Sequence, residues 1–334
     1  DDSGSTRILY TSTSDPDIGM GRIRIATPVD ESWQAWTKGS FVAEAPTGHD
    51  IVAYRDPFLI HEPDGRWRMF VGAGTRAKTA MALSYTSEDL ETWTYEGVAL
   101  SRASSTVDGV WMGALWECPQ IFEIDGSHVM VSSVWDDDVL HYAGYAVGNY
   151  RDGRFEARAW GRLTWGPSYY APSFFRDQDG RPCLTFWMRG VADLEAGWAS
   201  AHSVPHVLTL DGDTLVASPH PDLDAYRAAP TLDLAGTAVD IEWSPEPGSV
   251  LEVMGSEFSL TADGAAITAT GPDGEIASGP YHGTVRVIVD AQAVELSSPA
   301  GLIGFSAPTP AEQIHISASG TATVVPPLVR PLVR

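Results

Sequence analysis

Basic residues are scarce in this chain of 334 residues, which contains 21 Lys and Arg against 44 Asp and Glu. The formal charge of −23 is spread along the whole length rather than gathered in one tail. Such a field repels phosphate backbones, so we expect no nucleic-acid partner. Long apolar runs are also missing, because none approaches the ~20 residues that cross a bilayer. We therefore expect no membrane span.

Cysteine is almost absent as well, since Cys118 and Cys183 are the only two. They lie in different sequence neighbourhoods and provide neither a disulfide framework nor a zinc pattern. The histidines show no ligand spacing, and the chain has no nucleotide-binding motif. We therefore expect neither a metal nor another cofactor.

Helical periodicity is nearly missing from Arg7 to about Pro205, where short β-type runs alternate with Gly, Asp and Pro clusters. Asp-Gly between apolar runs is a strong hairpin signal. These turns are Asp64-Gly65, Asp125-Gly126 and Asp179-Gly180. Their spacing of roughly 50–60 residues is typical of repeated four-stranded propeller blades. A polar turn that ends in Trp also recurs, at residues 30–37 and 87–94.

We therefore predict an all-β chain with three segments. Residues 1–205 form a β-propeller catalytic domain, which at ~50–60 residues a blade holds about four blades. Residues 206–230 form a linker with a hairpin and a short helical turn. Residues 231–334 contain alternating strands and form a β-sandwich.

Two carboxylates have unusual neighbours. Asp56 follows Arg55 and precedes a proline, which fixes the backbone direction and predicts an ionised carboxylate. Glu117 stands between Trp116 and Cys118, an apolar setting that predicts a raised pKa and suits a proton donor. Cleavage of a glycosidic bond needs one protonated and one ionised carboxyl group. By spacing alone, the segments around Asp56 and Glu117 are explained equally well if both acidic residues only form turns.

Four motifs occur in the order in which glycoside hydrolase family 32 carries its equivalents. They are Arg55-Asp56-Pro57, Trp116-Glu117-Cys118-Pro119, Tyr170-Ala171-Pro172-Ser173-Phe174 and Phe186-Trp187-Met188. That family contains invertases, inulinases, levanases and fructosyltransferases, and the chain resembles it over most of residues 7–310. The resemblance implies a five-bladed β-propeller followed by a β-sandwich. It also implies a glycosidase that acts on β-fructofuranosides such as sucrose, inulin or levan by retaining double displacement.

The resemblance also implies roles for individual residues. Glu117 would be the general acid/base, and Asp56 would stabilise the transition state through the fructose hydroxyls. The other candidate substrate-binding residues are Arg55, Trp116, Tyr170 and Trp187. Plain core packing is the alternative for Tyr170 and Trp187. Cys118 is expected to support the position of Glu117 rather than to react, because this mechanism needs no thiolate.

The sequence departs from the family in its expected nucleophile. Family members carry this Asp in an Asn-Asp-Pro-Asn-Gly-like motif of the first blade, and no such segment precedes Asp56. The nearest string contains Asp15, but it follows a strand typical of the second blade, so Asp15 is not the preferred nucleophile. We therefore expect the first blade and the nucleophile to lie outside this chain. Three explanations stay open: a separate chain or fragment supplies them, the sequence is incomplete, or the propeller closes with fewer blades.

Two other functions stay open. An inverting arabinan- or xylan-type propeller glycosidase is opposed by the Glu-Cys-Pro string and the C-terminal sandwich. A catalytically inactive carbohydrate-binding relative fits the missing nucleophile, but it has no need of a proton donor at Glu117. Asp136-Asp137-Asp138 is either a sugar- or cation-binding cluster or, by preference, a solvated loop. The acidic composition and a saccharide substrate suggest an extracellular protein.

Overall fold

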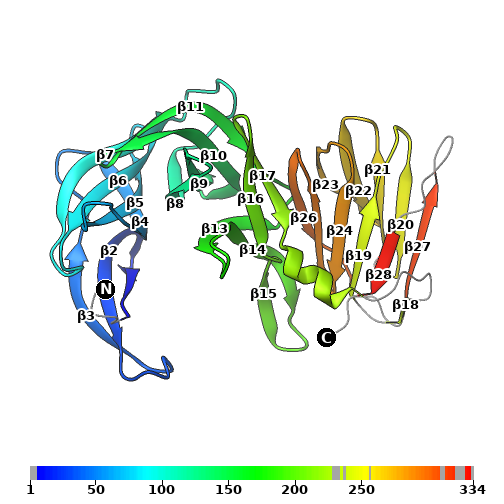
Figure 1. Ribbon diagram of the computed structural model, residues 1–334, viewed down its shortest axis with the longest axis horizontal. Coiled ribbons are helices and arrows are strands. Elements are labelled where there is room, and N and C mark those ends of the chain that lie inside the picture. Colours follow the sequence, from blue (N-terminus) through cyan, green and yellow to red (C-terminus); the bar gives the residue numbers. More distant parts are fainter. Residues whose placement is uncertain are drawn as a thin grey trace. The chain divides into compact units, whose positions relative to one another are not determined.

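The computed structural model describes residues 6–227, 234–235, 238–255, 257–308, 313–319 and 328–331. Strands and one 3-10 helix make up the regular structure of these residues, which confirms the all-β prediction (Figure 1). No helix among them is long and apolar enough to cross a membrane. The chain forms two compact units, residues 1–161 and 162–334. The domain boundaries predicted at residues 205 and 231 stay a prediction.

The eleven strands of the first unit form one hydrogen-bonded sheet, which divides in chain order into three smaller antiparallel sheets within which consecutive strands pair. The first sheet consists of β1 (Ile8–Ser14), β2 (Asp17–Pro28) and β3 (Trp36–Ala43). The second consists of β4 (Ile51–His61), β5 (Trp67–Thr75), β6 (Thr79–Ser87) and β7 (Thr94–Ala103). The third consists of β8 (Leu115–Ile124), β9 (Ser127–Asp136), β10 (Val139–Arg151) and β11 (Arg154–Arg162). Single bridges, Met20 with Tyr54 and Gly74 with Leu115, connect neighbouring sheets.

The local repeats of the sequence correspond to repeated structure. Each predicted Asp-Gly turn closes a hairpin, between β4 and β5, β8 and β9, and β13 and β14. The two Trp turns are built alike, because Trp36 Nε1 donates to the Trp33 carbonyl at 3.0 Å and Trp93 Nε1 to the Leu90 carbonyl at 2.9 Å. Trp33 and Leu90 both have positive φ angles, of 56° and 65°. The recurring unit predicted from the sequence is therefore confirmed.

Strand β5 contributes side chains to two hydrophobic clusters, one on each of its faces. Met69 and Val71 pack into one hydrophobic cluster, whereas Phe70 packs into a second cluster with Trp116. Successive side chains of a strand point to opposite faces, so β5 is covered by apolar side chains on both faces. This explains why its sequence reads as a continuous apolar run rather than as an alternating one.

The second unit begins with β12 (Thr164–Trp165) and a sheet of β13 (Tyr169–Arg176), β14 (Pro182–Asp193), β15 (Trp198–His202), β16 (His206–Asp211) and β17 (Thr214–Pro219). Strands β16 and β17 form the hairpin predicted there, and the 3-10 helix η1 (Pro221–Tyr226) is the predicted helical turn. One sandwich sheet contains β12 with β19 (Ala238–Trp243), β24 (Val285–Asp290), β25 (Ala293–Ser298), β26 (Gly301–Ser306) and β28 (Leu328–Pro331). The other contains β18 (Leu234–Ala235), β20 (Val250–Met254), β21 (Phe258–Ala262), β22 (Ala266–Gly271), β23 (Gly274–Pro280) and β27 (Gln313–Ser319).

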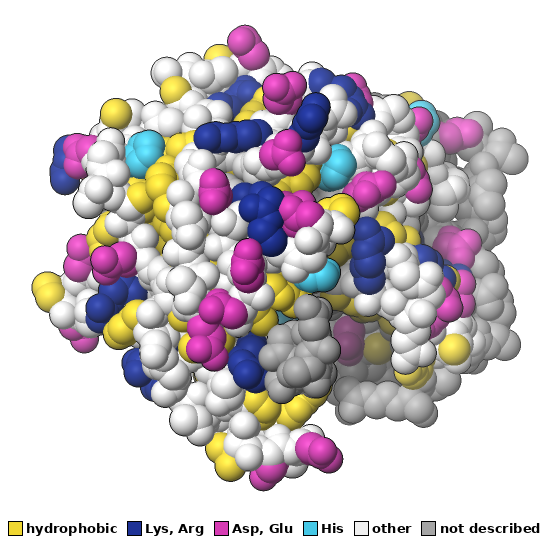
Figure 2. Space-filling view, turned by 60° about the vertical axis from the view of Figure 1, so that its left-hand side comes forward, with side chains coloured by type: hydrophobic (Ala, Val, Ile, Leu, Met, Phe, Trp, Pro, Cys, Tyr) yellow, Lys and Arg dark blue, Asp and Glu magenta, His cyan; other side chains and the backbone are white. Residues whose placement is uncertain are grey.

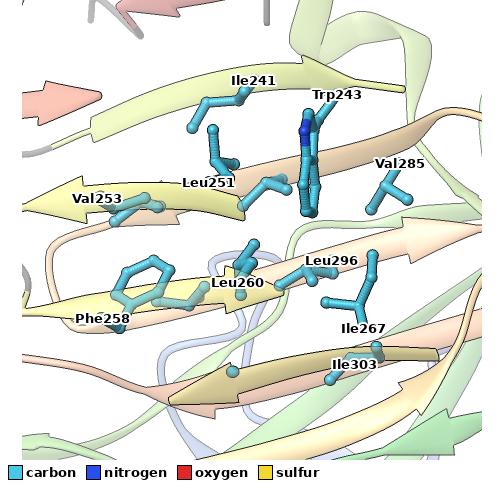
Figure 3. Close-up of a cluster of buried hydrophobic side chains, with 14 of the residues drawn as sticks. Ile241, Trp243, Leu251, Val253, Phe258, Leu260, Ile267, Val285, Leu296 and Ile303 are labelled. Carbon is cyan, nitrogen blue, oxygen red and sulfur yellow. The ribbon is translucent and has the colours of Figure 1, made fainter. Parts of the chain in front are cut away.

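Side chains from both sandwich sheets fill one core (Figure 3). Ile241 and Trp243 of β19 face Leu251 and Val253 of β20 in this view, and all four are almost fully buried. Inward-facing residues alternate along the strands, as a two-layer sandwich requires. On the face of the protein shown in Figure 2, basic side chains lie among acidic ones rather than in a patch of their own.

The second unit also contains a fully buried carboxyl group, that of Glu295 on β25. Tyr169 Oη donates to its Oε2 at 2.7 Å, and the Val204 backbone N donates to its Oε1 at 2.9 Å. Burial raises the pKa of Glu295 to about 7, despite these two hydrogen bonds. The folded unit therefore binds this proton more tightly than the unfolded chain does.

We expect this carboxyl group to make the second unit more stable below pH 4.5 than above pH 7. The stabilisation is fully present below the ordinary glutamate pKa and is lost as the pH rises to about 7, with a change of the order of 3 kcal/mol. Denaturant unfolding at pH 5 and pH 8 measures it. Glu295→Gln should remove this pH dependence, and a variant that keeps it would contradict the assignment.

Candidate functional site

Three strands carry the same β-bulge at the motifs singled out in the sequence. In β4 the register with β5 shifts between Arg55 and Phe58, in β8 the register with β9 shifts between Glu117 and Gln120, and β13 repeats the shift after Tyr170. The second residue of each bulge has a positive φ and precedes a proline. These residues are Asp56 (63°), Cys118 (51°) and Ala171 (46°). A bulge bends its strand and re-aims the side chains beside it.

The first unit brings two of these bulges together. Arg55 Nη1 lies 3.1 Å from Glu117 Oε1, and the two side chains are 24% and 13% exposed. Both residues line a pocket of about 590 Å³. The Nε–H of Arg55 is buried without an acceptor among the described residues, so the guanidinium keeps an unused donor. A half-buried ion pair on a pocket wall can position both groups for a ligand.

Asp56 is held by the neighbouring bulge. Its Oδ2 accepts a hydrogen bond from the Cys118 backbone N at 3.0 Å, and its own backbone N donates to Thr11 Oγ1 at 2.7 Å. Burial raises the pKa of Asp56, and it outweighs the Cys118 hydrogen bond and the charge of Arg55, which both lower it. Arg55 lowers the pKa of Asp56 as expected, but burial is the larger effect, and the ionised state of this carboxylate stays a prediction.

Cys118, expected to support Glu117, has a different partner in the structure. Cys118 contacts Asp56, through its backbone N and through Sγ at 3.6 Å, so it supports Asp56 rather than Glu117. Burial, followed by the charges of Asp56 and Glu117, raises the pKa of its thiol well above the ordinary value. A neutral thiol agrees with a residue that positions its neighbours and does not react.

Trp116 is fully buried, and its Nε1 donates to the Met112 carbonyl at 3.0 Å. Its indole belongs to the core cluster and packs against Trp160. The side chain thus fills the core behind Glu117, which differs from the substrate contact expected for it. Alternation along β8 explains the difference, since neighbouring side chains point to opposite faces.

Tyr170 and Trp187 lie in the second unit and are cross-strand partners on β13 and β14. Tyr170 is only 2% exposed, and the Arg189 guanidinium lies 4.7 Å from its ring centroid. Trp187 is 38% exposed, unlike a core residue of its size. Core packing therefore describes Tyr170, whereas the Trp187 indole presents an apolar surface of the kind on which sugar rings pack.

The acidic turn between β9 and β10 lies at the same pocket as Arg55 and Glu117. Asp136, Asp137 and Asp138 all line it, and Lys78 Nζ lies 3.0 Å from Asp136 Oδ1 and 2.7 Å from Asp137 Oδ2. The lysine takes the place that a bound cation would need. The turn therefore forms part of the pocket wall, and the preferred description of it as only a solvated loop is incomplete.

Two supporting residues were missed by the sequence reasoning. Ser132 Oγ donates to the Glu117 carbonyl at 2.8 Å, and Thr11 accepts the Asp56 backbone N. Only the pairing of β8 with β9 and the packing of β1 near β4 create these contacts, so no local pattern marks them. Asp15 lies in the exposed turn between β1 and β2, next to Pro16.

A close approach of two strands under the site depends on Gly72 of β5. A Cβ atom there would lie 2.2 Å from the Trp116 carbonyl oxygen and 3.2 Å from that of Arg55. We expect Gly72→Ala to lower the free energy of unfolding by about 1–3 kcal/mol, because the backbone must move apart. Thermal unfolding measures the loss, and Ser101→Ala at an exposed position of β7 is the control. Equal stability of both variants would contradict the tight packing.

Comparisons with known proteins show the family of this chain. The profile of the Glycosyl hydrolases family 32 N-terminal domain matches residues 1–219. A sucrose-6-phosphate hydrolase of Bacillus subtilis is 30% identical over 237 residues, 66% of this chain and 48% of that protein. A fructan 6-exohydrolase of Beta vulgaris is 25% identical over 258 residues, 66% of this chain and 41% of that protein. The chain thus spans about half the length of the curated relatives it matches or less.

Solved structures share the fold at low sequence identity. A β-fructofuranosidase of Bombyx mori matches with a TM-score of 0.81 and 20% identity, over 98% of this chain and 76% of that one. A fructan 1-exohydrolase of Cichorium intybus matches with a TM-score of 0.75 and 17% identity, over 99% of this chain and 82% of that one. The predicted propeller and sandwich architecture is confirmed, and the chain belongs to glycoside hydrolase family 32.

Proposed function

We propose that this chain carries the acid/base side of a site that cleaves β-fructofuranosides. The observation that carries the proposal is the cross-strand arrangement on two bulged strands, in which Arg55 and Glu117 pair on the wall of one pocket and Asp56 is bound to the bulge that carries Glu117. Relatives named for action on sucrose phosphate and fructan support the substrate class. A structure of a Bombyx mori relative contains sucrose, and one of a Cichorium intybus relative contains 1-kestose.

In the proposed reaction, Glu117 donates a proton to the glycosidic oxygen as its bond to the fructose anomeric carbon breaks. Asp56 accepts hydrogen bonds from fructose hydroxyls, and Arg55 orients Glu117 and binds sugar. A nucleophilic carboxylate, which we assign to none of the described residues, then holds the fructosyl group. Glu117 finally removes a proton from water or from an acceptor sugar, so that the configuration is retained.

The experiment is an assay of the purified protein on sucrose and inulin, preceded by intact-mass measurement and N-terminal sequencing. Release of fructose, first in the β-configuration by NMR, is the expected result. A second polypeptide with an Asn-Asp-Pro-type motif in the active preparation would identify the source of the nucleophile. A homogeneous 35.9 kDa chain that releases no fructose would overturn the proposal for this chain alone. Fructoside binding by that inactive chain would instead favour a carbohydrate-binding relative.

A further inference from the structure

A pocket of about 570 Å³ lies in the second unit, where the β13–β14 turn meets the start of η1. Its volume is within the range of small-molecule sites in proteins, about 300–1,000 Å³. Two aromatic side chains in its lining keep much of their surface uncovered, since Phe175 is 37% and Tyr226 is 52% exposed. An aromatic ring offers a large, rigid apolar face for packing. The pocket therefore presents apolar surface to a ligand of small-molecule size.

Hydrogen bonds fix the three segments that line this pocket. Asp177 Oδ1 accepts from the backbone N of Asp179 at 3.0 Å and of Arg181 at 2.8 Å, which closes the β13–β14 turn. Its Oδ2 accepts from His220 Nε2 at 3.0 Å, and the His220 backbone N donates to the Pro205 carbonyl at 2.8 Å. The turn, the residue before β16 and the start of η1 are thus connected before any ligand binds. Such preorganisation reduces the entropy that binding costs.

The polar part of the lining both donates and accepts hydrogen bonds. Arg181 Nε donates to Asp177 Oδ2 at 2.5 Å. Arg181 Nη2 lies 3.1 Å from Asp179 Oδ2 and 3.9 Å from Asp222 Oδ1. The Arg181 side chain is 33% exposed, and those of Asp179 and Asp222 are 74% and 80% exposed. A guanidinium only donates and a carboxylate only accepts, so the two together suit neighbouring hydroxyl groups, which do both.

The charges of the lining argue against ionic ligands. Two arginines and three aspartates line the pocket, so its formal charge is −1 with a neutral histidine. This balance and the chain charge of −23 repel an anion. A metal cation does not fit either, because Arg181 Nη2 lies 3.5 Å from His220 Nε2. That nitrogen carries the ring proton, since Nδ1 accepts from the Asp222 backbone N at 3.2 Å. A neutral ligand rich in hydroxyl groups is the class that fits.

We propose that this pocket is a binding site for a short neutral oligosaccharide. The C–H faces of the sugar rings pack on Phe175 and Tyr226. Adjacent hydroxyl groups accept hydrogen bonds from Arg181 and donate to the carboxylates of Asp179 and Asp222. The pocket shares no lining residue with the pocket of the proposed glycosidase site. The proposal is independent of the proposed glycosidase function, because it requires binding only.

The test is a saturation-transfer NMR titration with two neutral trisaccharides, maltotriose and 1-kestose. Maltotriose is added to the unmodified chain, and 1-kestose to Glu117→Gln so that it is consumed slowly. We expect saturable binding of at least one of them. Tyr226→Ala, which removes ring surface, and Asp222→Ala, which removes an acceptor, should each lower the affinity about tenfold. Phe41→Ala is the matched control at a phenylalanine of β3 that is 40% exposed, and it should leave the affinity unchanged.

Circular dichroism shows whether each variant is folded, and should one of them fail to fold, the other decides, since both side chains are exposed. Trigalacturonate has the same number of rings but three carboxylates, so it should bind at least about tenfold more weakly than the neutral probe. Loss of binding in Tyr226→Ala would support the site even in a chain that releases no fructose. No saturable binding, affinity unchanged in the folded variants, or equal affinity for trigalacturonate would each overturn the proposal.

Discussion

Replacing Glu117 with Gln is expected to lower turnover of sucrose about 10²–10⁴-fold, the usual contribution of a general acid/base. The amide keeps the size of the side chain and an oxygen for Arg55, which lies 3.1 Å from Glu117 Oε1, but it cannot donate the proton that the leaving oxygen needs. The loss should fall on kcat, while KM changes little. Initial rates of fructose release over a range of sucrose concentrations separate the two constants.

A fructoside with a good leaving group needs less protonation, so it should recover much of the rate of its first step in Glu117→Gln. Glu123→Gln is the matched control, because Glu123 is exposed on the same strand β8. It should turn over sucrose as the unmodified protein does. Unchanged turnover in Glu117→Gln would remove Glu117 from the site.

Removing the Asp240 carboxylate should destabilise the second unit by about 3–5 kcal/mol, the usual effect of breaking a buried ion pair. Its side chain is fully buried on β19, where Arg227 Nε lies at 2.8 Å and Arg286 Nη2 at 2.6 Å. Asp240→Ala leaves two guanidinium groups, 13% and 16% exposed, without this partner. Urea unfolding measures the change, and Asp273→Ala at an exposed position should alter stability by less than about 0.5 kcal/mol.

The same carboxylate should give the second unit an acid-sensitive component of stability. Burial by itself would raise the pKa of Asp240, but the hydrogen bonds and charges of Arg227 and Arg286 hold it below the ordinary value. Its contribution is therefore present above the unfolded pKa of about 3.9 and is lost as the pH falls through the folded value. Glu295 has the opposite sign. A stability difference between Asp240→Ala and the unmodified chain that does not shrink in acid would contradict this assignment.

The local features of the fold could be predicted from the sequence because short segments specify them. Asp-Gly turns require a positive φ, which Gly65 and Gly126 adopt at 88° and 77°, and they close hairpins wherever apolar runs flank them. The hairpin and helical turn at residues 206–226 follow from similar signals. The division after residue 161 could not be predicted, because it depends on which sheets pack together rather than on any boundary signal in the chain.

The site was predictable in its residue types and less so in its contacts. The sequence places Arg55 beside Asp56, yet in the structure Arg55 pairs with Glu117 and the Cys118 backbone contacts Asp56. These partners come from different strands, so neighbours in the sequence give no information about them. The burial that raises the pKa of Asp56 could not be predicted for the same reason, since it is set by surrounding elements.

The shared bulge makes Arg55, Glu117 and Tyr170 equivalent positions in three strands of one design. Each of these residues is followed by a residue with a positive φ and then by a proline. The bulged backbone is therefore set by the residues that follow, and not by the side chain that it presents. A different side chain at such a position can therefore be presented by the same bulged backbone. One backbone arrangement thus presents a guanidinium, a carboxyl group and a phenol at the matching positions of three different strands.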